Sequence, residues 1–203
     1  MGALGLGGID AVTIDGYGTL VELDDPVGRL SEALGKDAAA AWEVEGAYYR
    51  AHSLEGRDEA SLAELRLRCT RVFLEAADDT RDPATFVDAF QHALRFELIP
   101  GVVEALHSLR AHGLALAVVS NWDFGLHAHL GRIGIAHLFD AVVTSAETGV
   151  AKPDARIFLE ALARLRVAPE RALHVGDHAE SDEEGARVAG MQFAFAPLAN
   201  ALA

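Results

Sequence analysis

The feature that most constrains the fold is a series of short apolar runs that alternate with stretches of helical spacing. Beyond Pro100, apolar runs occupy residues 114–119, 141–144, 172–175 and 192–195, and the segments between them repeat apolar residues every three or four positions. An earlier run covers residues 9–14. Short buried strands that alternate with amphipathic helices are typical of a parallel sheet with helices on both faces. We therefore expect a doubly wound, Rossmann-like α/β core.

Residues 21–96 differ from this pattern. They are rich in Ala, Glu, Arg and Leu, with apolar residues at helical spacing and breaks near Gly35, Gly56 and Pro83. The segment has no convincing alternating strand, and the breaks divide it into about four helices. We expect an α/β core domain made of residues 1–20 and 97–203, with residues 21–96 inserted as an α-helical cap domain.

Composition limits the classes of partner. The 31 acidic and 17 basic residues give a formal net charge of −14, which disfavours binding to nucleic acid or to an anionic membrane. No apolar stretch approaches the roughly 20 residues that span a bilayer. The single cysteine, Cys69, excludes an intrachain disulfide and is compatible with the cytoplasm, where we expect the protein. Residues 1–8 are Gly-rich without a basic region, so we expect a flexible leader. The oligomeric state does not follow from the sequence.

Polar residues stand where the apolar runs end. Asp15 follows the first run, Ser120 and Asn121 follow the run 114–119, and Asp177 follows the run 172–175, whereas Lys152 precedes a predicted helix. The carboxyl ends of parallel strands share one edge of the sheet, and ligands bind at that edge. Each residue alone also has an ordinary interpretation, such as a solvated aspartate, a turn serine or a surface lysine.

Taken together and in order, these segments resemble the four motifs of the haloacid dehalogenase superfamily of aspartyl-nucleophile hydrolases. The motifs are Asp15 with Gly16 to Leu20, Ser120-Asn121, Lys152-Pro153-Asp154, and Gly176-Asp177 with Asp182. The resemblance covers nearly the whole chain, although residues 21–96 match only in general character.

The resemblance implies that Asp15 is a nucleophile, which attacks a phosphoryl group or a carbon atom and forms a covalent intermediate. It implies two further catalytic residues: Lys152 as a positive charge beside Asp15, and Ser120 as a hydrogen-bond donor to the substrate. Substrate contacts are expected from Asn121 and from the turn after Asp15, namely Tyr17, Gly18 and Thr19, with the amides of Tyr17 and Gly18 as anion donors. Arg50 of the cap is a further candidate for binding a substrate anion, although it could also be a surface arginine.

A metal site is expected if the fold brings Asp177 and Asp182 beside Asp15. Three carboxylates so close cannot all remain ionised without a cation, and Mg²⁺ suits an all-oxygen site. The resemblance implies that the ligands are Asp15, Asp177 and the backbone carbonyl of Tyr17, with Asp182 bound directly or through water. Asp182 could equally cap the following helix, and both roles are compatible.

Tyr17 departs from the pattern of phosphatases in this family, which usually have a second aspartate there as general acid and base. Tyrosine has an ordinary pKa of about 10 and is a poor proton donor at neutral pH. The family's dehalogenases also have an aromatic residue at this place, and they work without metal. The preferred function is a Mg²⁺-dependent phosphatase of a small phosphorylated metabolite, with a phosphoaspartyl intermediate. The alternatives are a metal-independent 2-haloacid dehalogenase and a weakly active binding protein.

Overall fold

A five-stranded parallel sheet forms the centre of the computed structural model, which describes residues 7–199. Its strands are β1 (Ala11–Ile14), β4 (Ala115–Ser120), β5 (Ala141–Thr144), β6 (Ala172–Gly176) and β7 (Gln192–Phe195), in the order β5-β4-β1-β6-β7. All four neighbouring pairs are parallel. The expected doubly wound α/β core is confirmed. Residues 1–6 of the predicted leader lie outside the described residues.

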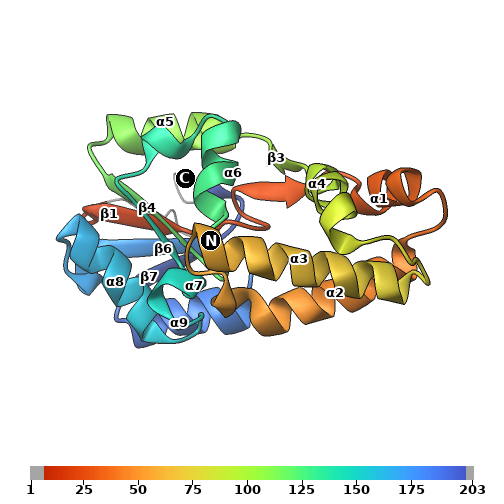
Figure 1. Ribbon diagram of the computed structural model, residues 1–203. Helices are drawn as coiled ribbons and strands as arrows, with labels where there is room; N and C mark the ends of the chain where they lie inside the picture. The colour runs from red at the N-terminus through yellow and green to blue at the C-terminus, as the bar shows by residue number, and fades with distance from the viewer. Residues whose placement is uncertain (1–6, 200–203) are drawn as a thin grey trace.

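Helices cover both faces of this sheet (Figure 1). Helices α5 (Val102–Ala111) and α6 (Leu126–Arg132) lie on one face, and α8 (Ala155–Leu165) and α9 (Glu184–Val188) lie on the other. Val12 and Ile14 of β1 belong to the first apolar cluster and Ala11 to the second, because successive side chains of a strand point to opposite faces. Both faces are buried, which explains why the strands are continuously apolar. Shorter turns of helix are η2 (Ala136–Leu138), α7 (Ser145–Thr148) and η3 (Pro169–Arg171).

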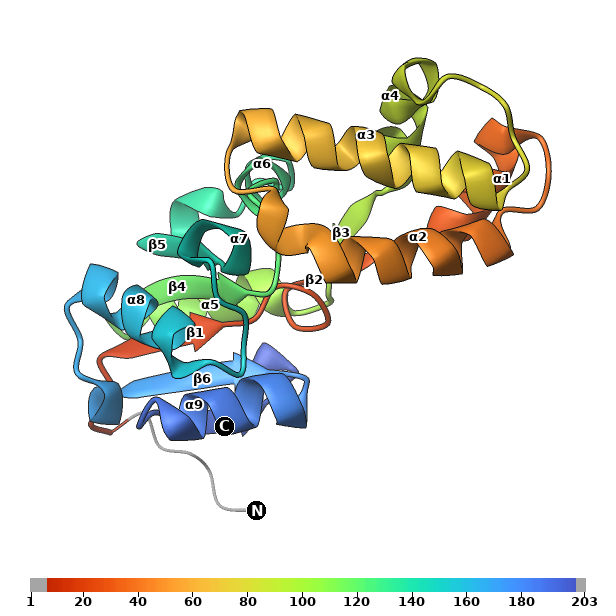
Figure 2. The ribbon, with the colours of Figure 1, turned by 60° about the horizontal axis from the view of Figure 1, so that its bottom comes forward.

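Four α-helices follow the first strand: α1 (Pro26–Leu34), α2 (Ala39–His52), α3 (Glu59–Ala76) and α4 (Pro83–Ala93). We call residues 26–93 the helical segment; it also contains the short turn η1 (Ser53–Glu55). Asp58 and Asp82 cap α3 and α4 by accepting hydrogen bonds from backbone amides, and Pro83 begins α4. The segment has an apolar cluster of its own, centred on Phe73, Phe86 and Phe90. Figure 2 shows α2 and α3 side by side beyond the end of the sheet. The division into two domains stays a prediction.

Two local expectations were wrong. The segment 21–96 does contain strand residues, because β2 (Val21–Leu23) pairs in antiparallel fashion with β3 (Phe96–Leu98) where the chain enters and leaves the helical segment. Three-residue strands are too short to show alternation, and their partners are more than seventy residues apart. The helix expected over 181–189 begins instead with a wide, π-type turn over Ala179–Glu183 and becomes α-helical only at Glu184.

Within residues 7–199, none of the helices is both long enough and apolar enough to cross a bilayer.

Candidate active site

The predicted site residues gather at the carboxyl edge of the three central strands. Strand β1 lies between β4 and β6, with Ile14 opposite Val118 and Val175. Asp15 therefore leaves the middle strand close to Ser120 on one side and Asp177 on the other. The Asp15 amide donates to the Val175 carbonyl at 2.9 Å, which continues the strand pairing as far as the carboxylate itself.

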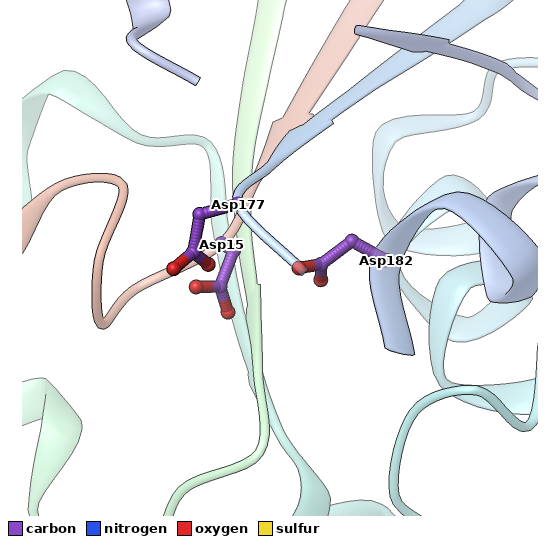
Figure 3. Close-up of side chains that lie close together, drawn as sticks. All are labelled: Asp15, Asp177 and Asp182. Carbon is purple, nitrogen blue, oxygen red and sulfur yellow. The ribbon is translucent and has the colours of Figure 1, made fainter. Parts of the chain in front are cut away.

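Three carboxylates converge at this edge. Asp15, Asp177 and Asp182 each offer an oxygen, and these three atoms lie within 4.8 Å of one another. Figure 3 shows Asp15 and Asp177 lying together, with the carboxylate of Asp182 directed toward them from the other side. Asp15 and Asp182 are buried, whereas Asp177 is exposed. The fold thus brings Asp177 and Asp182 beside Asp15, which is the arrangement for which the sequence predicts a metal site.

Two glycines give the carboxylates room. A Cβ atom on Gly18 would lie 2.2 Å from Oδ2 of Asp177, and one on Gly176 would lie 2.4 Å from Cγ of Asp182. Gly18 also has a φ of +85°, which side chains other than glycine rarely adopt. Its amide donates to the Val21 carbonyl at 2.9 Å and is thus not free to be the anion donor that the sequence suggested. What Gly18 contributes here is space for Asp177.

Lys152 joins two of the carboxylates. Its Nζ lies 2.5 Å from Oδ1 of Asp15 and 2.5 Å from Oδ1 of Asp182, and the side chain is buried. Burial alone would lower the pKa of Lys152, but the two carboxylates raise it, so the ammonium stays charged. The Ser120 hydroxyl donates to the same Oδ1 of Asp15 at 3.2 Å. Oδ1 of Asp15 is therefore held from two sides.

Asn121 positions the lysine through the backbone. Its side-chain Nδ2 donates to the carbonyl of Lys152 at 3.1 Å, and its Oδ1 accepts from the amide of Lys152 at 2.7 Å. This two-point contact joins the end of β4 to the loop before α8. The structure thus gives Asn121 a role in holding Lys152, beside the substrate contact that the sequence suggested.

Sequence reasoning missed two members of the site, Thr13 and His174. They are paired in register on neighbouring strands, and the Thr13 hydroxyl donates to Nδ1 of His174 at 2.8 Å. Nε2 of His174 lies 3.2 Å from Oδ1 of Asp182. Burial lowers the pKa of His174, and a neutral ring with its proton on Nε2 satisfies both contacts. The available signal was a polar residue within each of two otherwise apolar strands.

The surroundings of Asp182 and Asp177 shift the pKa values of these two carboxylates in opposite directions. Burial alone would raise the pKa of Asp182, but the hydrogen bond from His174 and the charge of Lys152 hold it well below its ordinary value. Oδ2 of Asp182 also accepts from the His178 amide at 3.0 Å. For Asp177, the partial loss of solvent around its carboxylate and the neighbouring charge of Asp15 raise the pKa. Asp177 is thus the carboxylate whose negative charge is least compensated by the protein.

The other residues that the sequence predicts to contact the substrate are Tyr17, Thr19 and Arg50. Tyr17 is 51% exposed. The hydroxyl of Thr19 is buried and has no hydrogen-bond partner among residues 7–199. Arg50 belongs to α2 and does not lie in the carboxylate cluster, but it does line a cavity beside it.

That cavity, of about 400 Å³, lies between the helical segment and the core; we call it the inter-layer cavity. Its lining includes Tyr17 and Asn121, which connect it with the carboxylate cluster. The other residues that line it are Leu23, Trp42, Glu45, Gly46, Tyr49, Arg50, Leu65, Arg66, Cys69, Phe90, Gln91, Leu94, Phe96, Trp122, Asp123 and His129. The wall is thus largely apolar and aromatic, with a few charged groups.

Comparison with known proteins identifies relatives along most of the chain. The family described as haloacid dehalogenase-like hydrolase matches residues 9–190. A phosphoserine phosphatase of Thermus thermophilus is 37% identical over 80% of this chain and 65% of its own length. An (S)-2-haloacid dehalogenase of a Pseudomonas species is 30% identical over 90% of this chain and 80% of its own. The human haloacid dehalogenase-like hydrolase domain-containing protein 3 is 42% identical over half of this chain, and the match spans only 41% of the human protein.

Solved structures agree on the fold. An L-2-haloacid dehalogenase from Xanthobacter autotrophicus aligns with a TM-score of 0.70 at 24% identity, over 91% of this chain and 76% of that one. A 2-haloacid dehalogenase from Pseudomonas syringae aligns with a TM-score of 0.65 at 27% identity, over 91% of this chain and 85% of its own.

Proposed function

The chain belongs to the haloacid dehalogenase-like hydrolases, and we propose that it is a Mg²⁺-dependent phosphatase of a small phosphorylated metabolite, with Asp15 as the nucleophile. The observation that carries this proposal is the charge balance of the site. Three carboxylates lie within 4.8 Å of one another, and the only cation that contacts them within residues 7–199 is Lys152. A site so negative would repel a phosphate unless a divalent cation were bound as well.

The donor set fits magnesium. All the candidate ligands are oxygen atoms, namely the carboxylates of Asp15 and Asp177 and the backbone carbonyl of Tyr17. Asp182 would contribute through Oδ2 or through a water molecule, because its Oδ1 already contacts Lys152 and His174. When bound, the ion would neutralise charge on the phosphoryl oxygens.

The reaction then follows from the contacts of Asp15. Lys152 and Ser120 hold Oδ1, which leaves Oδ2 to attack phosphorus. As the new bond forms, the bond between phosphorus and the ester oxygen breaks, and the leaving group departs with the electron pair. Water then attacks the phosphorus of the aspartyl phosphate, releasing inorganic phosphate and restoring the carboxylate. The hydroxyl of Thr19, which has no hydrogen-bond partner within residues 7–199, is available to a phosphoryl oxygen.

A specific observation also supports the second candidate, a metal-independent 2-haloacid dehalogenase. Tyr17 stands where a phosphatase would be expected to place its general acid, and a halide leaving group needs no proton. The similarity to the Pseudomonas dehalogenase extends over 90% of the chain. In that reaction Asp15 would attack the carbon that bears the halogen, halide would leave, and water would hydrolyse the resulting ester. The third candidate remains a weakly active binding protein that lacks the acid at Tyr17.

We further infer a small anionic molecule as the partner. The net charge of −14 disfavours nucleic acid, and Lys152 supplies the local positive charge that an anion needs. Cytoplasmic location remains our expectation.

The test is a panel of phosphate esters and 2-haloacids assayed with Mg²⁺ and with chelator. We expect release of inorganic phosphate that requires Mg²⁺ and is abolished in Asp15→Asn. Mg²⁺ should also raise the melting temperature, because a ligand of the native state stabilises it. Asp177→Asn should weaken that response, and Glu64→Gln, which changes an exposed carboxylate on α3, should not. Halide release in chelator, with no phosphate release, would establish the dehalogenase instead.

A further inference from the structure

The inter-layer cavity lies where the leaving group of a substrate bound at Asp15 would extend. Tyr17 and Asn121 belong both to its lining and to the surroundings of Asp15 and Lys152. A group attached to a phosphate at Asp15 would therefore extend into this space. A volume of about 400 Å³ lies within the range of small-molecule sites in proteins.

The walls of the cavity favour a flat, apolar group. Trp42 and Phe90 line it from the helical segment, and Phe96 and Trp122 line it from the other side. The rings of Phe96 and Trp122 are 4.9 Å apart, and the ring of His129 packs edge-on against Phe96 at 4.5 Å. Burial lowers the pKa of His129 to about 4, so its ring is neutral and adds to the aromatic wall. Aromatic rings bind other rings by stacking and edge-to-face contacts.

Two arginines in the lining have no partner among the residues that the structure describes. The guanidinium groups of Arg50 and Arg66 make no hydrogen bond or ion pair with any of residues 7–199, whereas Arg29, Arg68 and Arg81 of the same segment each pair with a carboxylate. Arg66 is half-buried on α3, and Arg50 is exposed on α2. A half-buried guanidinium with all its donors free is suited to a carboxylate or a phosphate.

The two acidic residues in the lining, Asp123 and Glu45, form no hydrogen bond with the guanidinium groups of Arg50 and Arg66 within residues 7–199. Asp123 is the carboxylate next to Arg66, but its Oδ2 accepts from the Tyr49 hydroxyl at 3.0 Å and its Oδ1 from the Gly125 amide at 2.7 Å. The other acid in the lining, Glu45, is 4% exposed, and burial raises its pKa to about 7. Burial raises the pKa of Asp123 as well, so the cavity contains two guanidinium groups and two acids whose negative charge burial disfavours.

From these observations we infer the substrate class: a phosphate monoester whose leaving group has an aromatic or similarly flat apolar body and a second anionic group, which Arg66 binds. The inference rests on the proposed phosphatase function. It also suits the position of Tyr17, because a phenolate is a weaker base than an alkoxide and its departure therefore depends less on a general acid. Arg50, nearer the solvent, is suited to guide the anion into the cavity.

The experiment compares three esters in the presence of Mg²⁺: phenyl phosphate, para-carboxyphenyl phosphate and phosphoglycolate. We expect kcat/KM for para-carboxyphenyl phosphate to exceed that for phenyl phosphate by about tenfold to a hundredfold, the range of a charge-assisted hydrogen bond. It should also exceed the value for phosphoglycolate, which has the carboxylate without the ring. In Arg66→Met the ratio of the two aryl esters should fall toward one. Arg71→Met, which changes an exposed arginine of α3 outside the cavity, should keep the wild-type ratio.

A binding measurement covers the case in which Arg66→Met folds poorly. In the Asp15→Asn protein, para-carboxyphenyl phosphate should raise the melting temperature more than phenyl phosphate does at equal concentration. Turnover of all three esters with equal kcat/KM, or an unchanged ratio in Arg66→Met, would overturn the inference and leave the phosphatase intact. Failure to release phosphate from any ester would overturn both.

Discussion

Glu45 offers the sharpest test of the structure, because its side chain is buried in the wall of the inter-layer cavity. It is 4% exposed, and burial raises its pKa from an ordinary 4.5 to about 7, although Cys69 and the charge of Arg50 act in the opposite direction. In the unfolded chain the same carboxyl group titrates near its ordinary value. Folding is therefore coupled to retention of a proton on Glu45 between these two pKa values.

The sign of the effect follows from proton counting. Below about pH 4.5 both states hold the proton, so the group does not alter stability with pH. Between 4.5 and about 7 the native state holds more protons than the unfolded state, so the free energy of unfolding falls as pH rises. Because each pKa unit corresponds to about 1.4 kcal/mol, the loss reaches at most about 3 kcal/mol. Above about pH 7 both states are ionised and the loss is constant.

Glu45→Gln removes this titration while keeping the shape of the side chain. We expect the variant to gain stability relative to wild type as pH rises from 4.5 to 7.5, by up to about 3 kcal/mol. The measurement is urea unfolding of both proteins across that range, so that the titration of all other groups cancels in the difference. Glu43→Gln, an exposed carboxylate of the same helix, is the matched control and should follow wild type. A difference between Glu45→Gln and wild type that stays constant with pH would refute the reasoning.

Three further predictions concern the site at the sheet edge. Lys152→Met, measured in chelator, should lower the free energy of unfolding by about 3–5 kcal/mol, because two buried carboxylates lose their partner; a change below 1 kcal/mol in urea unfolding would contradict the ion pairs. Thr13→Val should cost about 1–3 kcal/mol by leaving Nδ1 of His174 without a donor, and an unchanged unfolding midpoint would show that the contact is dispensable. Tyr17→Asp should speed hydrolysis of alkyl phosphates far more than aryl phosphates, within the 10²–10⁴-fold typical of general acid catalysis; equal wild-type rates for both ester classes would show that another group already supplies the proton.

The order of elements and the position of the key polar residues could be predicted from sequence because both are local properties. Continuous apolar runs indicate strands that are buried on both faces, and the residue at the end of such a run must lie at the edge of the sheet. This rule predicts that Asp15, Ser120 and Asp177 lie at that edge. The helical segment was equally visible, because helical periodicity needs only a window of about 11–18 residues.

Other features depended on which strands become neighbours, and that is decided by the sheet as a whole. Thr13 and His174 are 161 residues apart and meet only because β1 and β6 are adjacent. The shared contact of Lys152 with Asp15 and Asp182 depends on three separate loops ending at one edge. The resemblance led us to expect Lys152 beside Asp15, but the only sequence signal for the pairing of Thr13 with His174 is a polar residue in each of two apolar strands.

The sequence by itself thus determined the layers of the fold and the polar residues that follow the strands at the carboxyl edge of the sheet, because hydrophobic periodicity and strand ends are properties of short segments. Tertiary structure alone decided what each side chain touches. In the folded protein the Gly18 amide is hydrogen-bonded within a turn, and the side chain of Asn121 is hydrogen-bonded to the backbone of Lys152. The inter-layer cavity is lined by helices and strands that are far apart in the chain. The physical reason is that hydrogen bonds and cavities depend on distances of a few ångströms between elements, and local patterns do not specify those distances.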